Sequence, residues 1–362
     1  MNKIRVLIVD DSAVIRKTIA KALQKTGSIE VVGYAVNGLD AIEQISNLAP
    51  DLITLDIEMP VMDGLTTLEK IRETNKTIPI IMFSSLTHGG RDAAVRALTL
   101  GASECVGKPD HLTVSLESLL SVLQQELIPK IIELGKLPKI QSAQIANVAA
   151  ADAGEYAMLV RNKKIAKSGV KSICIGSSTG GPMALMQIFS QMLVVPQIPI
   201  FIVQHMPPAF TAMLANRLNT AGAIRVREAV DGEFAEPGVA YLAPGGFHMK
   251  IQKVDSKIMI RLNTDVPENN CRPSVDVLFR AAANIYADNL LAIVLTGMGS
   301  DGLKGCQAIS EKLGQVIVQD SATSIVWGMP GSVAQAGLAD AILPIDKIPS
   351  EIVSRVNQLK AI

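Results

Sequence analysis

Apolar runs alternate with amphipathic segments over about the first 125 residues of the chain. The apolar runs are residues 4–9, 31–35, 52–55, 78–83 and, more weakly, 105–106. Segments with helical periodicity, such as residues 13–25 and 38–48, lie between these runs. This repeated alternation of strand and helix predicts an α/β domain with a doubly wound, five-stranded parallel sheet and helices on both faces.

Polar side chains follow four of these five predicted strands. Asp10 and Asp11 follow the first strand, Asp56 the third, Ser84 the fourth and Lys108 the fifth. Ligands of open α/β sheets bind at the carboxyl ends of the strands, so three carboxylates and a lysine should converge there. Any single aspartate could instead cap a helix or begin a turn, but that interpretation does not explain the whole set.

Three clustered carboxylates repel one another unless a cation is present. An all-oxygen site with few protein ligands suits Mg²⁺, which keeps several waters and accepts phosphate oxygens. A carboxylate beside such an ion can attack a phosphoryl group and form an acyl phosphate. Lys108 would then neutralise the new charge, and the Ser84 hydroxyl could donate a hydrogen bond to it.

The loop after the third predicted strand has a specific motif. Residues 51–60 read Asp-Leu-Ile-Thr-Leu-Asp-Ile-Glu-Met-Pro, and Met-Asp-Gly follows at 62–64. With the acidic pair after the first strand and the Lys-Pro pair after the fifth, residues 1–125 resemble a response-regulator receiver domain. The resemblance implies that Asp56 is the phosphoacceptor, that Asp10, Asp11 and Asp56 hold Mg²⁺, and that Ser84 and Lys108 contact the phosphoryl group.

One position departs from the usual receiver pattern. Many receivers have an aromatic residue three positions before the lysine, and in this chain Cys105 stands there. The departure puts signal transmission through a swinging aromatic ring in doubt.

The periodicity fades between the two halves of the chain. Proline occurs at 129 and 138, residues 141–153 are rich in Ala and Gln, and residues 161–167 are basic. This composition predicts a linker that is partly helical at residues 117–133. We therefore expect three parts, namely a receiver domain at 1–125, a linker at 126–168 and a second domain at 169–362.

A glycine-rich stretch follows the first apolar run of the second half. The run covers residues 170–175, residues 176–182 read Gly-Ser-Ser-Thr-Gly-Gly-Pro, and a helical pattern covers 183–192. Such a turn can bind phosphate, serve as a plain structural turn or present a nucleophilic serine. Neither the GxGxxG nor the P-loop pattern is present, and Ser178 is the central residue of a G-x-S-x-G pattern.

A nucleophilic serine needs a base, and this half contains only two histidines. His205 follows the apolar run 198–203, which would place it at the same sheet edge as Ser178. His248 lies within residues 226–262, where short alternating runs predict hairpins. His205 is the favoured base and His248 the alternative.

A carboxylate is also needed, to fix the tautomer of the base. The most apolar run, residues 290–295, leads through Thr-Gly-Met-Gly-Ser to Asp301, which would lie at the same edge. Asp301 could equally cap the helix that begins near Leu303, and His205 could be a satisfied core histidine. The coincidence of Ser178, His205 and Asp301 at three strand ends favours a hydrolase domain with a mostly parallel sheet.

Several further motifs extend from these residues to the end of the chain. They are Gln-His-Met-Pro at 204–207, Ala-Pro-Gly-Gly-Phe-His-Met at 243–249, Arg-Pro-Ser-Val-Asp at 272–276, Leu-Thr-Gly-Met-Gly-Ser-Asp-Gly at 295–302 and Gly-Met-Pro-Gly at 328–331. With the glycine-rich turn, they make this half resemble the catalytic domain of chemotaxis protein-glutamate methylesterases. The resemblance implies that Ser178 is the nucleophile, His205 the base and Asp301 the orienting acid.

The same resemblance places Thr179 and Met298 beside the oxyanion and substrate site. It departs at Ser177, where the family usually has alanine and where a small side chain should be harmless.

The resemblance also implies a function. The enzyme would hydrolyse glutamate methyl esters on methyl-accepting chemotaxis receptors and deamidate receptor glutamines, after phosphorylation by a chemotaxis histidine kinase. Mg²⁺ would serve the receiver, and ester hydrolysis would need no cofactor. The alternative is a response regulator whose second domain only binds a ligand.

Composition narrows the choice of partners and compartment. The 362 residues include 34 basic and 34 acidic residues, so we expect no nucleic acid partner. We see no signal peptide and no apolar run of membrane-spanning length, which predicts a cytoplasmic protein without membrane insertion. The four cysteines show neither CxxC nor Cys/His ligand spacing, so disulfides and zinc are not expected.

Overall fold

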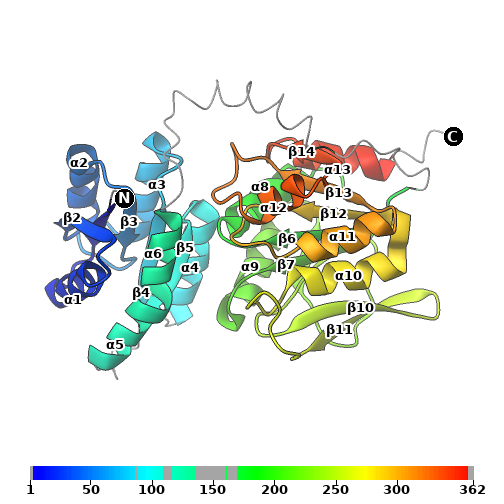
Figure 1. Cartoon of the computed structure of the whole chain (residues 1–362), viewed down its shortest axis with the longest axis horizontal. Coiled ribbons are helices and arrows are strands. Elements are labelled where there is room, and N and C mark those ends of the chain that lie inside the picture. The colour runs from blue at the N-terminus through cyan, green and yellow to red at the C-terminus, as the bar shows by residue number, and fades with distance from the viewer. Residues whose placement is uncertain (1–2, 86–87, 109–115, 136–159, 161–168, 358–362) are drawn as a thin grey trace. The chain divides into compact units, whose positions relative to one another are not determined.

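The computed structural model describes the chain except residues 1–2, 86–87, 109–115, 136–159, 161–168 and 358–362. It divides into two compact units, Met1–Gln141 and Ser142–Ile362. Most of the predicted linker, residues 126–168, lies outside the described residues. Each unit is built around its own parallel sheet (Figure 1).

The first unit has a parallel sheet with the strand order β2-β1-β3-β4-β5. Its strands are β1 (Ile4–Val9), β2 (Ile29–Ala35), β3 (Leu52–Leu55), β4 (Ile80–Ser85) and β5 (Glu104–Lys108). Its helices are α1 (Ala13–Gln24), α2 (Gly38–Leu48), α3 (Gly64–Thr74), α4 (His88–Leu100), α5 (Leu116–Val122), the π-helical segment η1 (Leu123–Leu127) and α6 (Ile128–Leu134). This is the predicted doubly wound receiver fold.

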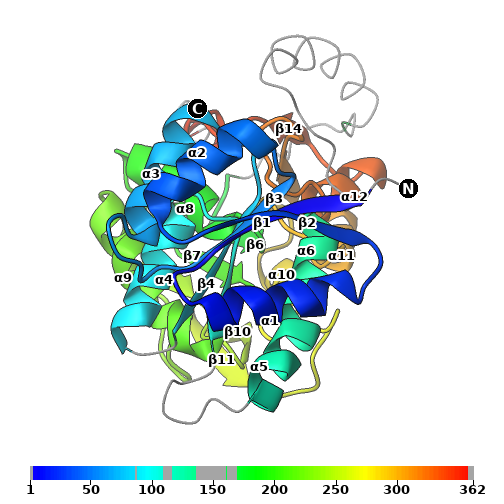
Figure 2. The ribbon, with the colours of Figure 1, turned by 90° about the vertical axis from the view of Figure 1, so that its left-hand side faces the viewer.

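Helices cover both faces of this sheet (Figure 2). Helices α2, α3 and α4 pack in sequence on one face, while α1 lies beside η1 on the other. All four residues of β3 are buried, as a central strand covered on both faces requires. The helical run that starts at α5 continues through η1 to Leu134, and it buries Leu127 and Ile131 completely.

The second unit has a seven-stranded parallel sheet with the order β14-β13-β12-β6-β7-β9-β8, and a separate hairpin of β10 and β11. The strands are β6 (Ser172–Ser177), β7 (Ile200–Gln204), β8 (Arg225–Glu228), β9 (Val239–Leu242), β10 (His248–Val254), β11 (Lys257–Asn263), β12 (Leu290–Val294), β13 (Gln315–Gln319) and β14 (Ala341–Leu343). The helices are α8 (Gly181–Gln191), α9 (Pro208–Ala221), α10 (Val275–Tyr286), the short 3-10 helix η2 (Ala287–Asn289), α11 (Leu303–Glu311), α12 (Met329–Gln335) and α13 (Ile348–Asn357).

This sheet too is covered on both faces. Helix α8 packs against α9 and α13, and α11 packs against α10 and α12. The strands β6, β7, β9 and β12 are buried at every position, in keeping with their largely apolar sequences. The predicted mostly parallel α/β domain is confirmed.

The predicted hairpin region contains one hairpin, not several. Strands β10 and β11 pair in antiparallel fashion, whereas β8 and β9 pair in parallel within the main sheet. Strand β8 is an edge strand, and part of it is exposed. An edge strand that is buried only in part shows the same alternation of polar and apolar residues as a hairpin strand, so the pattern alone could not separate the two.

Arg72 ties α3 to two loops of the first unit. Its buried guanidinium donates hydrogen bonds of 2.8–2.9 Å to the Gly101 carbonyl, 2.8 Å to the Ile78 carbonyl and 3.0 Å to the Asn75 carbonyl. Water cannot easily replace these bonds at a buried position.

We predict that Arg72→Met lowers the free energy of unfolding of the first unit by about 3 kcal/mol, because buried carbonyls lose their donors. The control is Arg96→Met, which removes an exposed ion pair with Glu69 and should cost less than about 0.5 kcal/mol. Calorimetric or denaturant unfolding of both variants measures the difference. Equal stability of the two variants would contradict the role assigned to Arg72.

Candidate active site and phosphorylation site

The first unit gathers three carboxylates at the carboxyl edge of its sheet. Side-chain oxygens of Asp10, Asp11 and Asp56 lie within 4.8 Å of one another. Asp10 and Asp11 follow β1, and Asp56 follows the neighbouring strand β3, as their places in the sequence predict. Asp10 and Asp56 are buried and Asp11 is exposed, so the cluster has one open side.

Lys108 at the end of β5 compensates part of this negative charge. Its Nζ lies 2.8 Å from Asp10 Oδ2 and 2.6 Å from Asp56 Oδ2. Burial raises the pKa of the Asp56 carboxyl to about 6, and the nearby Asp10 adds to this effect, whereas Lys108 opposes it. One lysine thus leaves the cluster short of positive charge.

The cluster has the donor set that a magnesium ion requires. Asp10 Oδ1 accepts a 2.9 Å hydrogen bond from the Ser12 amide, and among the described residues the buried Asp10 Oδ2 has only the Lys108 ammonium, at 2.8 Å, as a polar partner. A buried carboxylate oxygen of this kind suits a hard cation, and few protein oxygens suffice for Mg²⁺. The residues present therefore fit the predicted ion.

The other two receiver positions lie on neighbouring strands. Ser84 is buried near the end of β4 and pairs across the sheet with Gly107, next to Lys108. Cys105 lies on β5, and burial raises the pKa of its thiol to about 12. At neutral pH this group is an uncharged side chain with no ring to swing.

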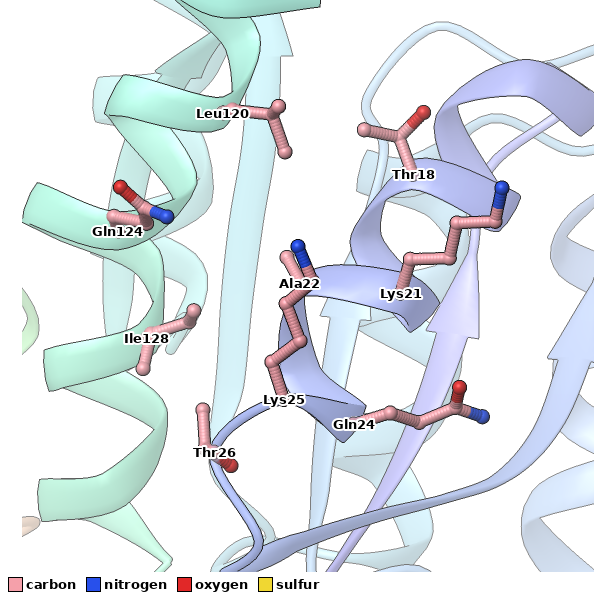
Figure 3. A pocket seen from close by; sticks show the side chains of 9 residues that line it. All are labelled: Thr18, Lys21, Ala22, Gln24, Lys25, Thr26, Leu120, Gln124 and Ile128. Carbon is pink, nitrogen blue, oxygen red and sulfur yellow. The ribbon is translucent and has the colours of Figure 1, made fainter.

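A cavity of about 640 Å³ lies in the first unit, away from these carboxylates (Figure 3). Lys21 of α1 and Lys25, which caps the C-terminus of that helix, lie on one wall, and Leu120, Gln124 and Ile128 of the α5–α6 run form the other. None of the clustered aspartates lines this cavity, so the size of a cavity does not identify the predicted phosphorylation site of this unit.

Ser178 of the second unit lies in a tight turn between β6 and α8. Its amide donates a 3.0 Å hydrogen bond to the Thr296 carbonyl, and its own carbonyl accepts a 2.7 Å bond from the Gly181 amide. Gly297 approaches this turn so closely that a Cβ there would lie 2.8 Å from the Ser178 Cβ. Only glycine fits at that position, and the contact fixes the nucleophile candidate against the end of β12.

Gln204 joins the turn to the neighbouring strand. Its Oε1 accepts a 2.7 Å hydrogen bond from Ser177 Oγ, and its Nε2 donates to the carbonyls of Ser178 at 2.9 Å and His205 at 3.0 Å. No role for Gln204 was predicted from the sequence, and Ser177 was expected only to be harmless. The signals available for Gln204 were its place beside His205 and within the Gln-His-Met-Pro motif.

His205 and Asp301 form a close pair at this edge. His205 Nε2 lies 2.8 Å from Asp301 Oδ2, and the two side chains are 13% and 2% exposed. Burial lowers the pKa of the imidazole, but the hydrogen bonds and charges of Asp301 and Cys271 outweigh it and raise the pKa to about 9. The carboxylate thus fixes the ring and stabilises its protonated form.

Asp301 lies at the N-terminus of α10. Its carboxylate accepts hydrogen bonds from the Val275 amide at 2.7 Å, the Asp276 amide at 3.0 Å and Ser274 Oγ at 2.9 Å. Burial raises the pKa of this carboxyl, yet the His205 bond and these backbone donors bring it down to about 2. Asp301 therefore interacts mainly with the N-terminus of α10. It does not cap α11, the helix considered from the sequence, because the N-cap there is Gly302, whose amide donates a further 3.0 Å bond to Asp301 Oδ1.

His248, the alternative base, is buried and contacts backbone groups. His248 is 1% exposed, its Nδ1 accepts a 3.2 Å hydrogen bond from the Ser274 amide, and its Nε2 lies 3.1 Å from the Val266 carbonyl. Both ring nitrogens are occupied by backbone groups, which disfavours His248 as a base.

The structure brings Ser178 and His205 to adjacent strands without a hydrogen bond between their side chains. The amide of His205 donates a 3.0 Å bond to the Ser177 carbonyl, which holds the two segments together. His205 Nδ1 lies 3.5 Å from Cys271 Sγ instead of contacting the serine. His205 and Cys271 line a cavity of about 320 Å³, with Met206, Pro207 and Pro273 among its other walls.

Thr179 and Met298 lie on the two segments that flank Ser178. Thr179 is buried, and its carbonyl accepts a 3.0 Å hydrogen bond from Thr296 Oγ1. Met298 is half-buried and directly follows Gly297, the residue that contacts the Ser178 turn. Their roles remain predictions.

No helix among the described residues is both long and apolar enough to cross a membrane.

Comparison with known proteins covers both units. The CheB methylesterase family matches residues 173–352, and the response regulator receiver domain matches residues 6–119. A protein-glutamate methylesterase/protein-glutamine glutaminase of Trichodesmium erythraeum is 44% identical over 357 residues, which are 99% of this chain and 100% of that protein. The protein of the same description from a Nocardioides species is 43% identical over 360 residues, 98% of this chain and 96% of its own length.

A solved structure matches the second unit. The catalytic domain of the Thermotoga maritima CheB methylesterase aligns with a TM-score of 0.50 and 43% identity, covering 52% of this chain and 99% of that domain. The chain therefore belongs to the family of CheB methylesterases, enzymes with protein-glutamate methylesterase and protein-glutamine glutaminase activity that carry a response-regulator receiver domain.

Proposed function

We propose that Ser178, His205 and Asp301 form the catalytic triad of this methylesterase and that its substrates are methylated glutamates of chemotaxis receptors. The observation that carries the proposal is the 2.8 Å contact between His205 and a buried, ionised Asp301, one strand away from the Ser178 turn. Such a base, held by a carboxylate beside a serine in a strand-to-helix turn, suits acyl transfer.

Each ring nitrogen of His205 has a separate task in this proposal. Nε2 carries a proton and donates it to Asp301, because that carboxylate is ionised. Nδ1 is then the nitrogen that accepts the proton of Ser178 Oγ as this oxygen attacks the γ-carbonyl of the receptor glutamate. The protonated ring next gives its proton to the departing methoxide, which leaves as methanol, and water releases the acyl group from Ser178 as glutamate.

The same steps deamidate a receptor glutamine, with ammonia as the leaving group. The developing oxyanion would lie near the start of α8, a helix that begins at Gly181 without a side-chain cap. Backbone donors at such a helix start contribute on the order of 3 kcal/mol each to transition-state stabilisation. Thr179 and Met298 would flank this position.

We further propose that the receiver controls the esterase through phosphorylation of Asp56 by a chemotaxis histidine kinase. Asp10, Asp11 and Asp56 would hold Mg²⁺, which supplies charge compensation for phosphoryl transfer. Lys108 and Ser84 would contact the phosphoryl group. We assign the receiver to residues 1–125, the linker to 126–168 and the catalytic domain to 169–362, and we place the enzyme in the cytoplasm with its receptor and kinase partners.

The nucleophile assignment predicts that Ser178→Ala reduces methanol release from methylated receptors by at least about 10³-fold, because no oxygen remains to form the acyl-enzyme. The same variant should lose labelling by a fluorophosphonate. Ser190→Ala, which removes an exposed hydroxyl from α8, is the matched control and should keep both activities. Retained methanol release by Ser178→Ala would refute the assignment.

The raised pKa of His205 predicts that kcat/KM increases with pH up to a midpoint near 9. Below that pH the ring is protonated and cannot accept the serine proton, so the rate should fall about tenfold per pH unit. Asp301→Asn removes the ionised partner that raises this pKa. The midpoint should move to lower pH, and the maximal rate should drop by about 10³-fold or more.

A pH series of methanol release for both proteins measures these effects. An unchanged midpoint in Asp301→Asn would show that Asp301 is not the partner of the base.

The regulatory proposal predicts that acetyl phosphate with Mg²⁺ accelerates the wild-type enzyme and leaves Asp56→Asn unaffected, because the variant lacks the attacking carboxylate. Deletion of residues 1–140 should raise the basal rate if the unphosphorylated receiver inhibits the esterase. Glu69→Gln, on the exposed side of α3, is the control and should respond like the wild type. A truncated chain no faster than the full one would contradict inhibition by the receiver.

A further inference from the structure

Cys271 makes a contact with the proposed base that the triad does not require. Its Sγ lies 3.5 Å from His205 Nδ1, within hydrogen-bonding range for sulfur. Cys271 is a free thiol, only partly buried, and it lines the same cavity as His205. This contact lies at the nitrogen that the esterase mechanism assigns to Ser178.

Hydrogen bonds and an ion pair hold the turn that carries Cys271. Backbone bonds of 2.9 Å and 3.1 Å join Cys271 and Glu268 in both directions, and the Glu268 carboxylate pairs with the Arg280 guanidinium through contacts of 2.8 Å and 2.6 Å. Asn269 and Asn270, between them, both have positive φ values of 54° and 60°. The thiol is thus held in place by its backbone.

The same turn also holds the other partner of the base. Asn269 Nδ2 donates hydrogen bonds of 2.8 Å to Asp301 Oδ1 and 3.0 Å to Asp276 Oδ2. Residues 268–271 therefore contact His205 at one nitrogen through Cys271 and support its other nitrogen through Asp301. The turn that positions the thiol is therefore the same turn that supports Asp301.

A neutral imidazole has one acceptor nitrogen. Asp301 engages Nε2, so Nδ1 is the acceptor, and two donors can use it: the thiol of Cys271 and the hydroxyl of Ser178. Among the described residues, Ser178 Oγ makes no hydrogen bond to the ring. Below its pKa of about 9 the ring is protonated, so Nδ1 then donates to the Cys271 sulfur and cannot accept a proton from the serine.

We infer that Cys271 is a positioning residue of the resting enzyme: its sulfur accepts a hydrogen bond from the protonated Nδ1 of His205, and this contact must break before Nδ1 can take the proton of Ser178. The inference rests on the proposed role of His205 as the base for Ser178. An entering ester group would reach the thiol through the cavity that both residues line. A thiol sulfur is a weak acceptor, so the contact is lost easily once Nδ1 gives up its proton.

The charged groups around His205 define what a pH measurement would report. Asp301 and Cys271 face the ring directly, and both raise its pKa. Asp276 and the Glu268–Arg280 pair interact electrostatically with Asp301 behind it. Removing the thiol leaves these other groups in place, so a changed midpoint can be assigned to Cys271.

The test follows the rate of Ser178 labelling by a fluorophosphonate as a function of pH, in the full-length unphosphorylated chain. We expect Cys271→Ala to lower the midpoint by about one pH unit and to label about tenfold faster at pH 7, because the sulfur no longer stabilises the proton on Nδ1. Cys271→Ser keeps an acceptor at the same position and should label more slowly than Cys271→Ala. Cys105→Ala, in the other unit, should keep the wild-type midpoint.

Imidazole NMR of the ¹⁵N-histidine-labelled chain gives a second, independent measurement. The His205 titration should shift to lower pH in Cys271→Ala, while unchanged His248 signals would show that the fold is intact. Equal midpoints in wild type and Cys271→Ala, or slower labelling of the alanine variant, would overturn the inference. Ser178→Ala separates the two proposals, because persistent labelling there would refute the triad itself.

Discussion

The proposed active site of the second unit depends on one buried carboxylate. Asp301 is 2% exposed, and it is ionised because the N-terminus of α10 and the imidazole of His205 provide its hydrogen-bond donors. An unpaired carboxylate at this depth would be costly, so the helix start and the histidine must both be in place. This single group fixes α10, the loop after β12 and the ring of the base relative to one another.

The carboxylates of the receiver have the opposite charge balance from Asp301. Its carboxylates outnumber the cation that faces them, and Asp56 keeps a pKa near 6 even with Lys108 beside it. The cluster thus favours the binding of further positive charge, whereas the charge of Asp301 is already satisfied by protein groups. This contrast agrees with the proposed functions, in which the first site takes up a metal ion and a phosphoryl group and the second fixes the orientation of a base.

Much of this arrangement could be predicted because parallel strands end at a common edge. From that rule alone, the sequence predicts that Asp10, Asp56 and Lys108 converge at the edge of one sheet and that Ser178, His205 and Asp301 converge at the edge of the other. The contacts of Gln204 and Cys271 could not be predicted. They arise from side-chain direction and from an irregular turn at residues 268–271, and neither has a periodic signature in the sequence. The parallel pairing of β8 could not be predicted either. This strand lies at the sheet edge with one partner, and such a strand shows the same alternation of polar and apolar residues as a hairpin strand.

We propose that Ser178 forms a covalent acyl-enzyme at this site. To test this, the enzyme is mixed with methylated receptor, quenched with acid within the first turnover, and the modified peptide is mapped by mass spectrometry. We expect an ester-linked receptor glutamyl fragment on the peptide that contains Ser178, and none in Ser178→Ala. A covalent adduct on any other residue, or full turnover with no adduct detected on Ser178, would contradict it.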